Sequence, residues 1–93
     1  MCRNIRTLHN FDPPTTKDEM HAAALQYVRK VSGMQKPTQA EQFAFERAVN
    51  EITASTEHLI RSLVPRDPRR TREGEMKKAR ERWKQREARM QRA

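Results

Sequence analysis

The residues of this sequence best suited to chemistry are basic side chains gathered near its C-terminal end. Positions 66–92 contain twelve Lys and Arg residues and five Asp and Glu residues, and Trp83 lies among them. Guanidinium and ammonium groups bind phosphate oxygens, and an indole ring stacks on exposed bases. We therefore predict a nucleic-acid-binding segment composed of the following residues: Arg66, Arg69, Arg70, Arg72, Lys77, Lys78, Arg80, Arg82, Trp83, Lys84, Arg86, Arg89 and Arg92.

Two arginines near the start, Arg3 and Arg6, are further candidates, because each could anchor the N-terminal segment or meet a phosphate. No pattern of base recognition is visible, so the predicted contacts are to the backbone and shape of the nucleic acid rather than to its sequence. The alternative interpretation of residues 66–92 is a solvated charged helix or a disordered tail, since five acids partly compensate the positive charge.

The other reactive side chains form no recognisable catalytic or metal site. Cys2 would become an N-terminal nucleophile if Met1 were removed, but a small hydrophobic residue beneath the N-terminal segment is the simpler interpretation. A metal site would need Cys2, His9, His21 and His58, and their spacing matches no known ligand pattern. We therefore expect no enzyme activity, no metal and no cofactor.

The composition of the 93 residues excludes several other classes of protein. Hydrophobic residues make up 34% and charged residues 34%, with a mean hydropathy of −1.12. No run approaches the ~20 apolar residues that cross a bilayer, so no membrane span is expected. One cysteine excludes an intramolecular disulfide, and two glycines exclude a glycine-rich phosphate loop. A chain this short buries little surface, which argues against a large substrate pocket.

The net charge of +8 is concentrated in one part of the chain. Residues 65–93 have a balance of +7, whereas residues 1–64 have a balance of only +1. Such asymmetry is typical of a tail that contacts a polyanion. The first residues lack the apolar stretch of a secretory signal, and Pro13-Pro14 would break a presequence helix. We expect an intracellular protein, located in the mitochondrial matrix or, alternatively, in the cytoplasm.

Two helices are expected to form an antiparallel hairpin. The first is predicted over residues 17–32, with a capping box at Thr16 and Glu19 and a left-handed stop at Gly33. The second is predicted to run from a second capping box at residues 38–41 to about Val64, just before Pro65. Apolar residues at helical spacing are the predicted core: Met20, Ala24, Tyr27, Val28, Val31, Phe45, Ala48, Val49, Ile52, Leu59, Ile60 and Leu63.

The remaining segments are an extended N-terminal arm and a separate basic helix. Residues 1–15 form the arm, whose apolar side chains are expected to attach it to a neighbouring helix. Residues 65–68 contain two prolines and form a hinge. From about Thr71 onward the residues are strong helix formers, with apolar side chains only at Met76, Ala79, Trp83 and Met90. The predicted fold is therefore all-α, with a module over residues 1–64 and a hinged basic helix over residues 65–93.

Several stretches of the sequence resemble one family of small proteins. They are Met1 to Leu8, Asn10 to Pro14, Ala22 to Gly33, Lys36-Pro37, Ala44 to Val49 and Ser62 to Val64. Together these stretches resemble domain-of-unknown-function family 2277 over about residues 1–64. The resemblance implies no activity and no catalytic residues. The segment from Trp83 to Arg92 extends beyond the family pattern, which indicates a helical module recruited into a larger assembly.

These features lead to two hypotheses of different classes. In the first, the protein is a non-enzymatic RNA-binding component of a ribonucleoprotein, specifically a ribosome and in particular a mitochondrial one. Its partners would be rRNA, bound by the C-terminal helix, and neighbouring proteins, bound by the hairpin, with no small-molecule substrate. In the second, it is an assembly subunit or adaptor that docks on an acidic protein surface through the Met76–Trp83–Met90 side of that helix.

Overall fold

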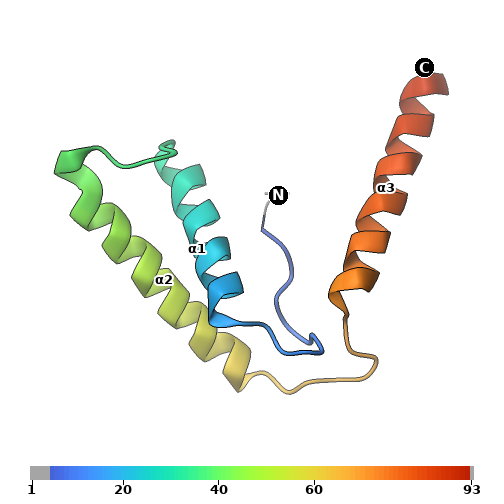
Figure 1. Ribbon diagram of the computed structural model, residues 1–93, viewed down its shortest axis with the longest axis horizontal. Helices are drawn as coiled ribbons and strands as arrows, with labels where there is room; N and C mark the ends of the chain where they lie inside the picture. Colours follow the sequence, from blue (N-terminus) through green and yellow to red (C-terminus); the bar gives the residue numbers. More distant parts are fainter. Residues whose placement is uncertain (1–4, 93) are drawn as a thin grey trace.

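Three helices make up most of the structure, a computed structural model that describes residues 5–92. They are α1 (Lys17–Ser32), α2 (Gln42–Ser62) and α3 (Arg72–Arg92), and a short 3-10 helix, η1 (Gln39–Glu41), precedes α2 (Figure 1). Residues 5–92 form no strand, and their one ladder contact is an isolated parallel bridge between Phe11 and Arg70. The predicted all-α fold is confirmed.

Helix α1 begins and ends at the predicted residues. The Thr16 Oγ1 accepts a hydrogen bond from the Glu19 amide at 3.2 Å, and the Glu19 Oε1 accepts one from the Thr16 amide at 2.9 Å. Both halves of a capping box are therefore present. At the other end, Gly33 has φ of +72° and donates its amide to the Arg29 carbonyl at 3.0 Å. Glycine adopts this left-handed conformation without the steric cost of a Cβ atom.

The predicted capping box at the start of α2 is wrong. The Glu41 amide donates to the Thr38 backbone carbonyl at 3.0 Å, and the Thr38 side chain caps nothing. This i→i+3 bond closes the 3-10 turn η1, so the α-helix itself starts later, at Gln42. Helix α2 ends at Ser62, two residues before the predicted Val64, because the residue before Pro65 is biased toward extended backbone.

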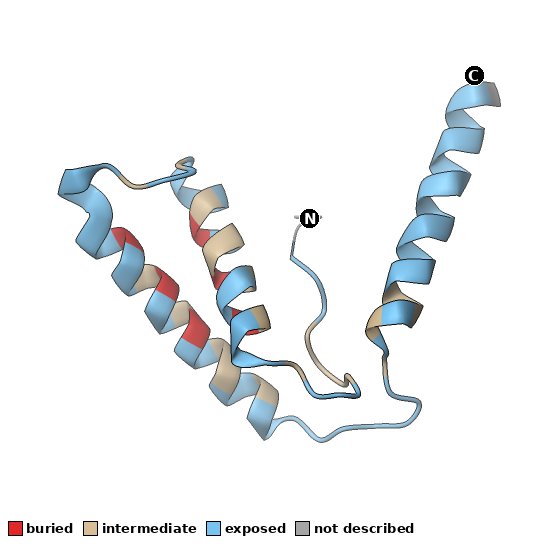
Figure 2. Cartoon of the chain, viewed as in Figure 1, coloured by how far each residue is buried: buried red, intermediate tan, exposed pale blue. Residues whose placement is uncertain are grey.

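The core lies between α1 and α2, which run antiparallel and form the predicted hairpin (Figure 1). Figure 2 shows the buried positions along the facing sides of these two helices. Each helix contributes three buried residues, namely Met20, Ala24 and Val28 from α1 and Phe45, Val49 and Thr53 from α2. The buried Thr53 hydroxyl donates to the Val49 carbonyl at 2.7 Å, so this polar group costs no unsatisfied hydrogen bond.

Four of the predicted core residues are not in the core. Tyr27 is 47% exposed, Val31 64%, Leu59 55% and Leu63 39%. Two helices can bury only the sides that face each other, and these residues lie on the flanks or in the last turns. Helical spacing identified the apolar side of each helix but overestimated its buried width, because no third helix covers the hairpin.

Helix α3 stands apart from the hairpin (Figure 1). No Cα atom of α3 lies within 8 Å of one in α1 or α2. The chain is consequently elongated, with a Cα radius of gyration of 16.4 Å, whereas a compact chain of this length would have about 12 Å. None of the helices in residues 5–92 is both long enough and apolar enough to cross a membrane.

Candidate nucleic-acid interface

The N-terminal arm binds the linker between α2 and α3. The Asp12 amide donates to the Arg70 carbonyl at 2.9 Å, and the Arg70 amide donates to the Asn10 carbonyl at 2.7 Å. We call the contact of residues 9–14 with residues 65–72 the arm–linker junction. Its hydrogen bonds hold the proline-containing segment that the sequence predicted to be a hinge.

The Asn10 side chain binds the linker at two points of this junction. Its Nδ2 donates to the Pro68 carbonyl at 3.3 Å, and its Oδ1 accepts from the Arg66 amide at 2.8 Å. Its φ is +69°, a left-handed conformation that asparagine tolerates better than most residues with a Cβ atom. A single side chain therefore binds the linker at two points two residues apart.

Arg72, the first residue of α3, connects this helix to α1. Its Nη2 and Nε donate to the two carboxylate oxygens of Glu19 at 2.6 and 3.1 Å, in a bidentate pair. The same guanidinium donates to the carbonyls of Pro13 and Pro14 at 2.8 and 3.2 Å. Its Cζ also lies 5.4 Å from the centre of the Phe11 ring, within the range of a cation–π contact.

These contacts change the acidity of Glu19. The hydrogen bonds from Arg72, followed by the hydrogen bond from the Thr16 amide, lower the pKa of Glu19 from its usual 4.5 to about 2. The same pair raises the pKa of Arg72, with the Glu19 hydrogen bonds as the main cause. Glu19 is therefore ionised in the folded chain at any physiological pH, and Arg72 is engaged within the chain.

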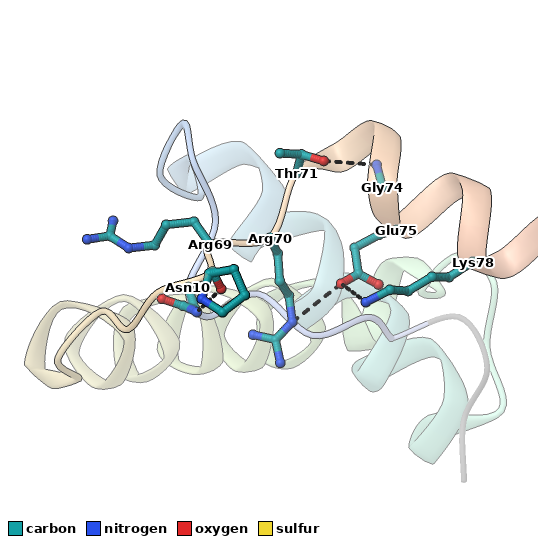
Figure 3. Close-up of a pocket in the computed structure, with 8 residues that line it drawn as sticks. Asn10, Arg69, Arg70, Thr71, Gly74, Glu75 and Lys78 are labelled. Atoms are coloured by element: carbon teal, nitrogen blue, oxygen red, sulfur yellow. Dashed lines mark hydrogen bonds and ion pairs between the residues drawn. The ribbon is translucent and has the colours of Figure 1, made fainter.

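A pocket of about 290 Å³ lies beside the junction, at the first turn of α3 (Figure 3). Glu75 lies between Arg70 and Lys78, with its Oε1 at 3.4 and 3.9 Å from their nitrogens, whereas Arg69 points away from it. Arg69 pairs instead with Asp67 at 3.6 Å. Each basic side chain at this pocket has an acidic neighbour, although Arg70 and Lys78 share the single carboxylate of Glu75.

The exposed part of α3 has a different electrostatic character. Beyond the first turn, no carboxylate oxygen within the described residues lies within 4.0 Å of six of its cations. All six are exposed to solvent: Lys77, Arg80, Arg82, Lys84, Arg86 and Arg89. Trp83 is 54% exposed, and its Nε1 donates to Glu87 at 3.0 Å.

The structure thus divides the predicted nucleic-acid-binding residues into two groups. Arg70 and Arg72 bind other parts of the chain, and Arg69 and Lys78 have acidic neighbours. Arg66, in the linker, belongs to neither group, because its backbone amide binds Asn10 whereas its side chain is exposed and has no carboxylate within 4.0 Å among the described residues. The second group consists of the six cations of α3 and Trp83. Arg6 is exposed in the arm, whereas Arg3 and the side chain of Arg92 lie outside the described residues.

The apolar residues of α3 lie along one narrow side of the helix, and most of its cations lie on the rest of its surface. With 3.6 residues per turn, Met76, Ala79, Trp83 and Met90 fall within a sector about 60° wide. The six cations are distributed around most of the remaining circumference. Helix α3 therefore presents a broad basic surface and one narrow apolar side.

The sequence did not reveal the arm–linker junction. Thr16 and Glu19 are three residues apart, so a capping box accounts for both, and no local signal indicates that Glu19 also binds Arg72, 53 residues away. The φ of Asn10 and its bonds to the linker depend equally on distant contacts. Among residues 5–92, no three His, Cys, Asp or Glu side chains lie close enough together to hold a metal ion.

Comparison with known proteins identifies the family. No curated protein and no solved structure matches the chain. The sequence pattern of a family described as "Uncharacterized conserved protein (DUF2277)" matches residues 1–78, which include the hairpin, the arm–linker junction and the start of α3. This match extends beyond the residues 1–64 that carried the resemblance. The chain belongs to the DUF2277 family of uncharacterised conserved proteins.

Proposed function

We propose that this protein is a non-enzymatic RNA-binding component of a ribonucleoprotein, and that α3 binds the RNA backbone. The observation that supports this proposal is the set of six exposed cations on α3 with no carboxylate oxygen within 4.0 Å among the described residues. A cation that is not neutralised within its own chain can replace a counterion at a phosphate. The cations at the start of α3, by contrast, attach the helix to the arm and to α1.

The length of α3 and the spacing of its cations suit a contact with the RNA backbone. Lys77 and Arg89 are twelve residues apart, which corresponds to about 18 Å along a helix. Their intervening cations lie on several sides of the helix, so neighbouring phosphate strands could be contacted together. Trp83, halfway between them, offers a ring for stacking on an unpaired base.

The particle that we propose is a ribosome, in the mitochondrial matrix or, alternatively, in the cytoplasm. A small chain with a pI of about 10.6 and charge gathered on one helix is typical of proteins that bind structured RNA. The hairpin would contact neighbouring proteins, and the exposed Tyr27, Val31 and Leu59 supply apolar surface for them. The ribosome is the first particle to test because it offers both kinds of partner.

The salt dependence of RNA binding tests the phosphate contacts. Affinity for a labelled structured RNA should be measured by fluorescence anisotropy between about 50 and 200 mM salt. If about six cations meet phosphates, a plot of log K against log salt has a slope of about −4 to −5. A slope near zero would contradict the proposal.

Matched variants locate the binding surface. Changing Lys77, Arg80 and Lys84 together to Gln should reduce the magnitude of the slope by about 2 to 3, because each lost contact contributes about 0.7 to 0.9. The control changes Lys17, Lys30 and Lys36 to Gln, which removes the same charge from the hairpin side, and should leave the slope unchanged. An equal effect of both triple variants would mean that only net charge matters.

Sedimentation with ribosomal particles tests the biological assembly. The full chain should co-sediment with these particles and be released by RNase or by high salt. Release by neither treatment, together with retention on an acidic protein after nuclease treatment, would favour the alternative function of an assembly subunit. Truncation after Val64 removes α3 and should abolish RNA binding, although both helices of the hairpin are still present.

A further inference from the structure

The apolar side of α3 has no partner in the described chain. Met76 is 54% exposed, Trp83 54% and Met90 60%, and no Cα atom of α1 or α2 lies near them. These three residues are seven positions apart, and Ala79 follows Met76 by three. A seven-residue repeat with a second apolar position three residues later is the pattern by which helices pair in a coiled coil.

We propose that α3 pairs with α3 of a second copy of this chain, parallel and in register. In this arrangement Met76, Ala79, Trp83 and Met90 would each face their counterparts, so that the paired form would bind RNA through its cations and not through the Trp83 ring. The charges that flank the apolar side are the reason to expect a second copy of this chain as the partner. In a parallel pair, the residue just before Met76 and the residue just before Trp83 each face the residue that lies five places later on the other helix. Glu75 then faces Arg80, and Arg82 faces Glu87, so both types of contact join opposite charges.

Two other arrangements of a pair bring like charges together. An antiparallel pair with Trp83 packed on Ala79 of the second copy would place the two Arg82 side chains together and the two Arg80 side chains together. A parallel pair shifted by seven residues would place Glu75 against Glu87. The charges that flank the apolar side therefore favour the parallel, in-register form over these two alternatives.

Within one chain, Arg82 and Glu87 are better placed for such a contact than Glu75 and Arg80. Glu87 accepts a hydrogen bond from Trp83 at 3.0 Å, which places its carboxylate beside the apolar side of the helix. Arg82 is exposed and has no carboxylate within 4.0 Å among residues 5–92. Glu75 already lies near Arg70 and Lys78, so Arg82 and Glu87 are the better pair to test.

Two features of α3 oppose pairing and affect its salt dependence. Arg86 falls on the paired side, between Trp83 and Met90, where it faces Arg86 of the second copy, and both side chains must extend past the helices to reach water. The helix also carries nine basic and four acidic residues, so two copies repel each other. Salt screens this repulsion. Self-association should therefore strengthen as salt rises, whereas RNA binding should weaken.

Charge exchange tests the proposed pairing. Self-association of the full chain, without RNA, is measured by sedimentation equilibrium for Arg82→Glu and Glu87→Arg. Each change alone replaces two attractive contacts of the dimer with two repulsive ones, and should weaken association several-fold. The double variant R82E/E87R should restore association, and an equimolar mixture of the two single variants should form a mixed dimer.

Two outcomes would overturn the pairing. One is a wild-type chain that stays monomeric at every concentration and salt level. The other is a pair of single variants that associate as strongly as the wild type. Because RNA is absent from the experiment, either result leaves the proposed RNA-binding function standing. Loss of RNA binding in the experiments above would equally leave the pairing intact.

Disulfide trapping tests the direction of the helices. In a Cys2→Ser background, Met90→Cys would place two thiols across a parallel, in-register pair. Ala88→Cys is the matched control, because it lies two residues away on the outer side of the same helix. Oxidation should join the Met90→Cys chains rapidly and the Ala88→Cys chains slowly. Equal rates would contradict the proposed arrangement.

Discussion

Arg72 and Glu19 show how one pair of side chains can connect distant parts of a small chain. Glu19 completes the capping box of α1 and at the same time accepts two hydrogen bonds from the first residue of α3. Arg72 was predicted to bind nucleic acid, yet its donors are bound to Glu19, Pro13 and Pro14. At the residue scale, a basic side chain that contacts several acceptors within its own chain contributes more to structure than to ligand binding.

The ionisation of Glu19 gives a pH-dependent prediction. Its pKa is lower in the folded chain, about 2, than its usual 4.5, so the ionised carboxylate stabilises the folded state. In urea unfolding, wild type should be more stable than Glu19→Gln at neutral pH. That difference should be complete above pH about 4.5 and decrease as pH falls toward about 2. A difference that stays constant over this range would mean that the charge of Glu19 does not stabilise the fold.

At the scale of elements, α1 is the helix whose limits the sequence determines best. Its capping box and Gly33 are local signals, and both operate as predicted. The start of α2 is set instead by competition between a 3-10 turn and a side-chain cap at Thr38, and the turn prevails. Sequence patterns predict such a boundary less well, because two conformations satisfy the same residues.

Two neighbouring phenylalanines of α2 provide a matched test of the hairpin core. Phe45 is 8% exposed and packs against Ala24 and Val28, whereas Phe43 is 78% exposed. Phe45→Ala should lower the free energy of unfolding by about 3 kcal/mol, because it removes a large side chain from a thin core. Phe43→Ala should change it by less than about 0.5 kcal/mol. Urea titrations followed by circular dichroism would measure both, and similar losses would contradict this core.

For the whole molecule, the arm–linker junction decides where α3 leaves the hairpin. It connects residues near the beginning of the chain to residues more than fifty positions later, through Asn10, Arg70 and Arg72. The family match covers this junction and ends at residue 78, within α3. The residues of the junction therefore lie within the segment that matches the family.

Asn10 gives a test of this attachment. Asn10→Ala removes both side-chain bonds to the linker, and should increase hydrogen exchange at the Arg66 amide about thirtyfold, since each of the two lost bonds contributes about 1 kcal/mol. Asn10→Asp retains the acceptor for the Arg66 amide and should preserve more protection. The Gly33 amide, at the end of α1, serves as the internal control. Unchanged exchange at Arg66 in the alanine variant would show that the linker is held by other contacts.

The sequence by itself determined the helical class, the limits of α1, the facing sides of the hairpin and the concentration of charge in the last third. All of these depend on local spacing: helical periodicity, a capping box, a glycine stop and runs of helix-forming residues. Only the tertiary structure decided that the arm binds the linker, that Arg72 binds Glu19 and that four predicted core residues are exposed. These features depend on which distant segments meet. The same contacts determine which cations of the basic segment are left exposed for a partner.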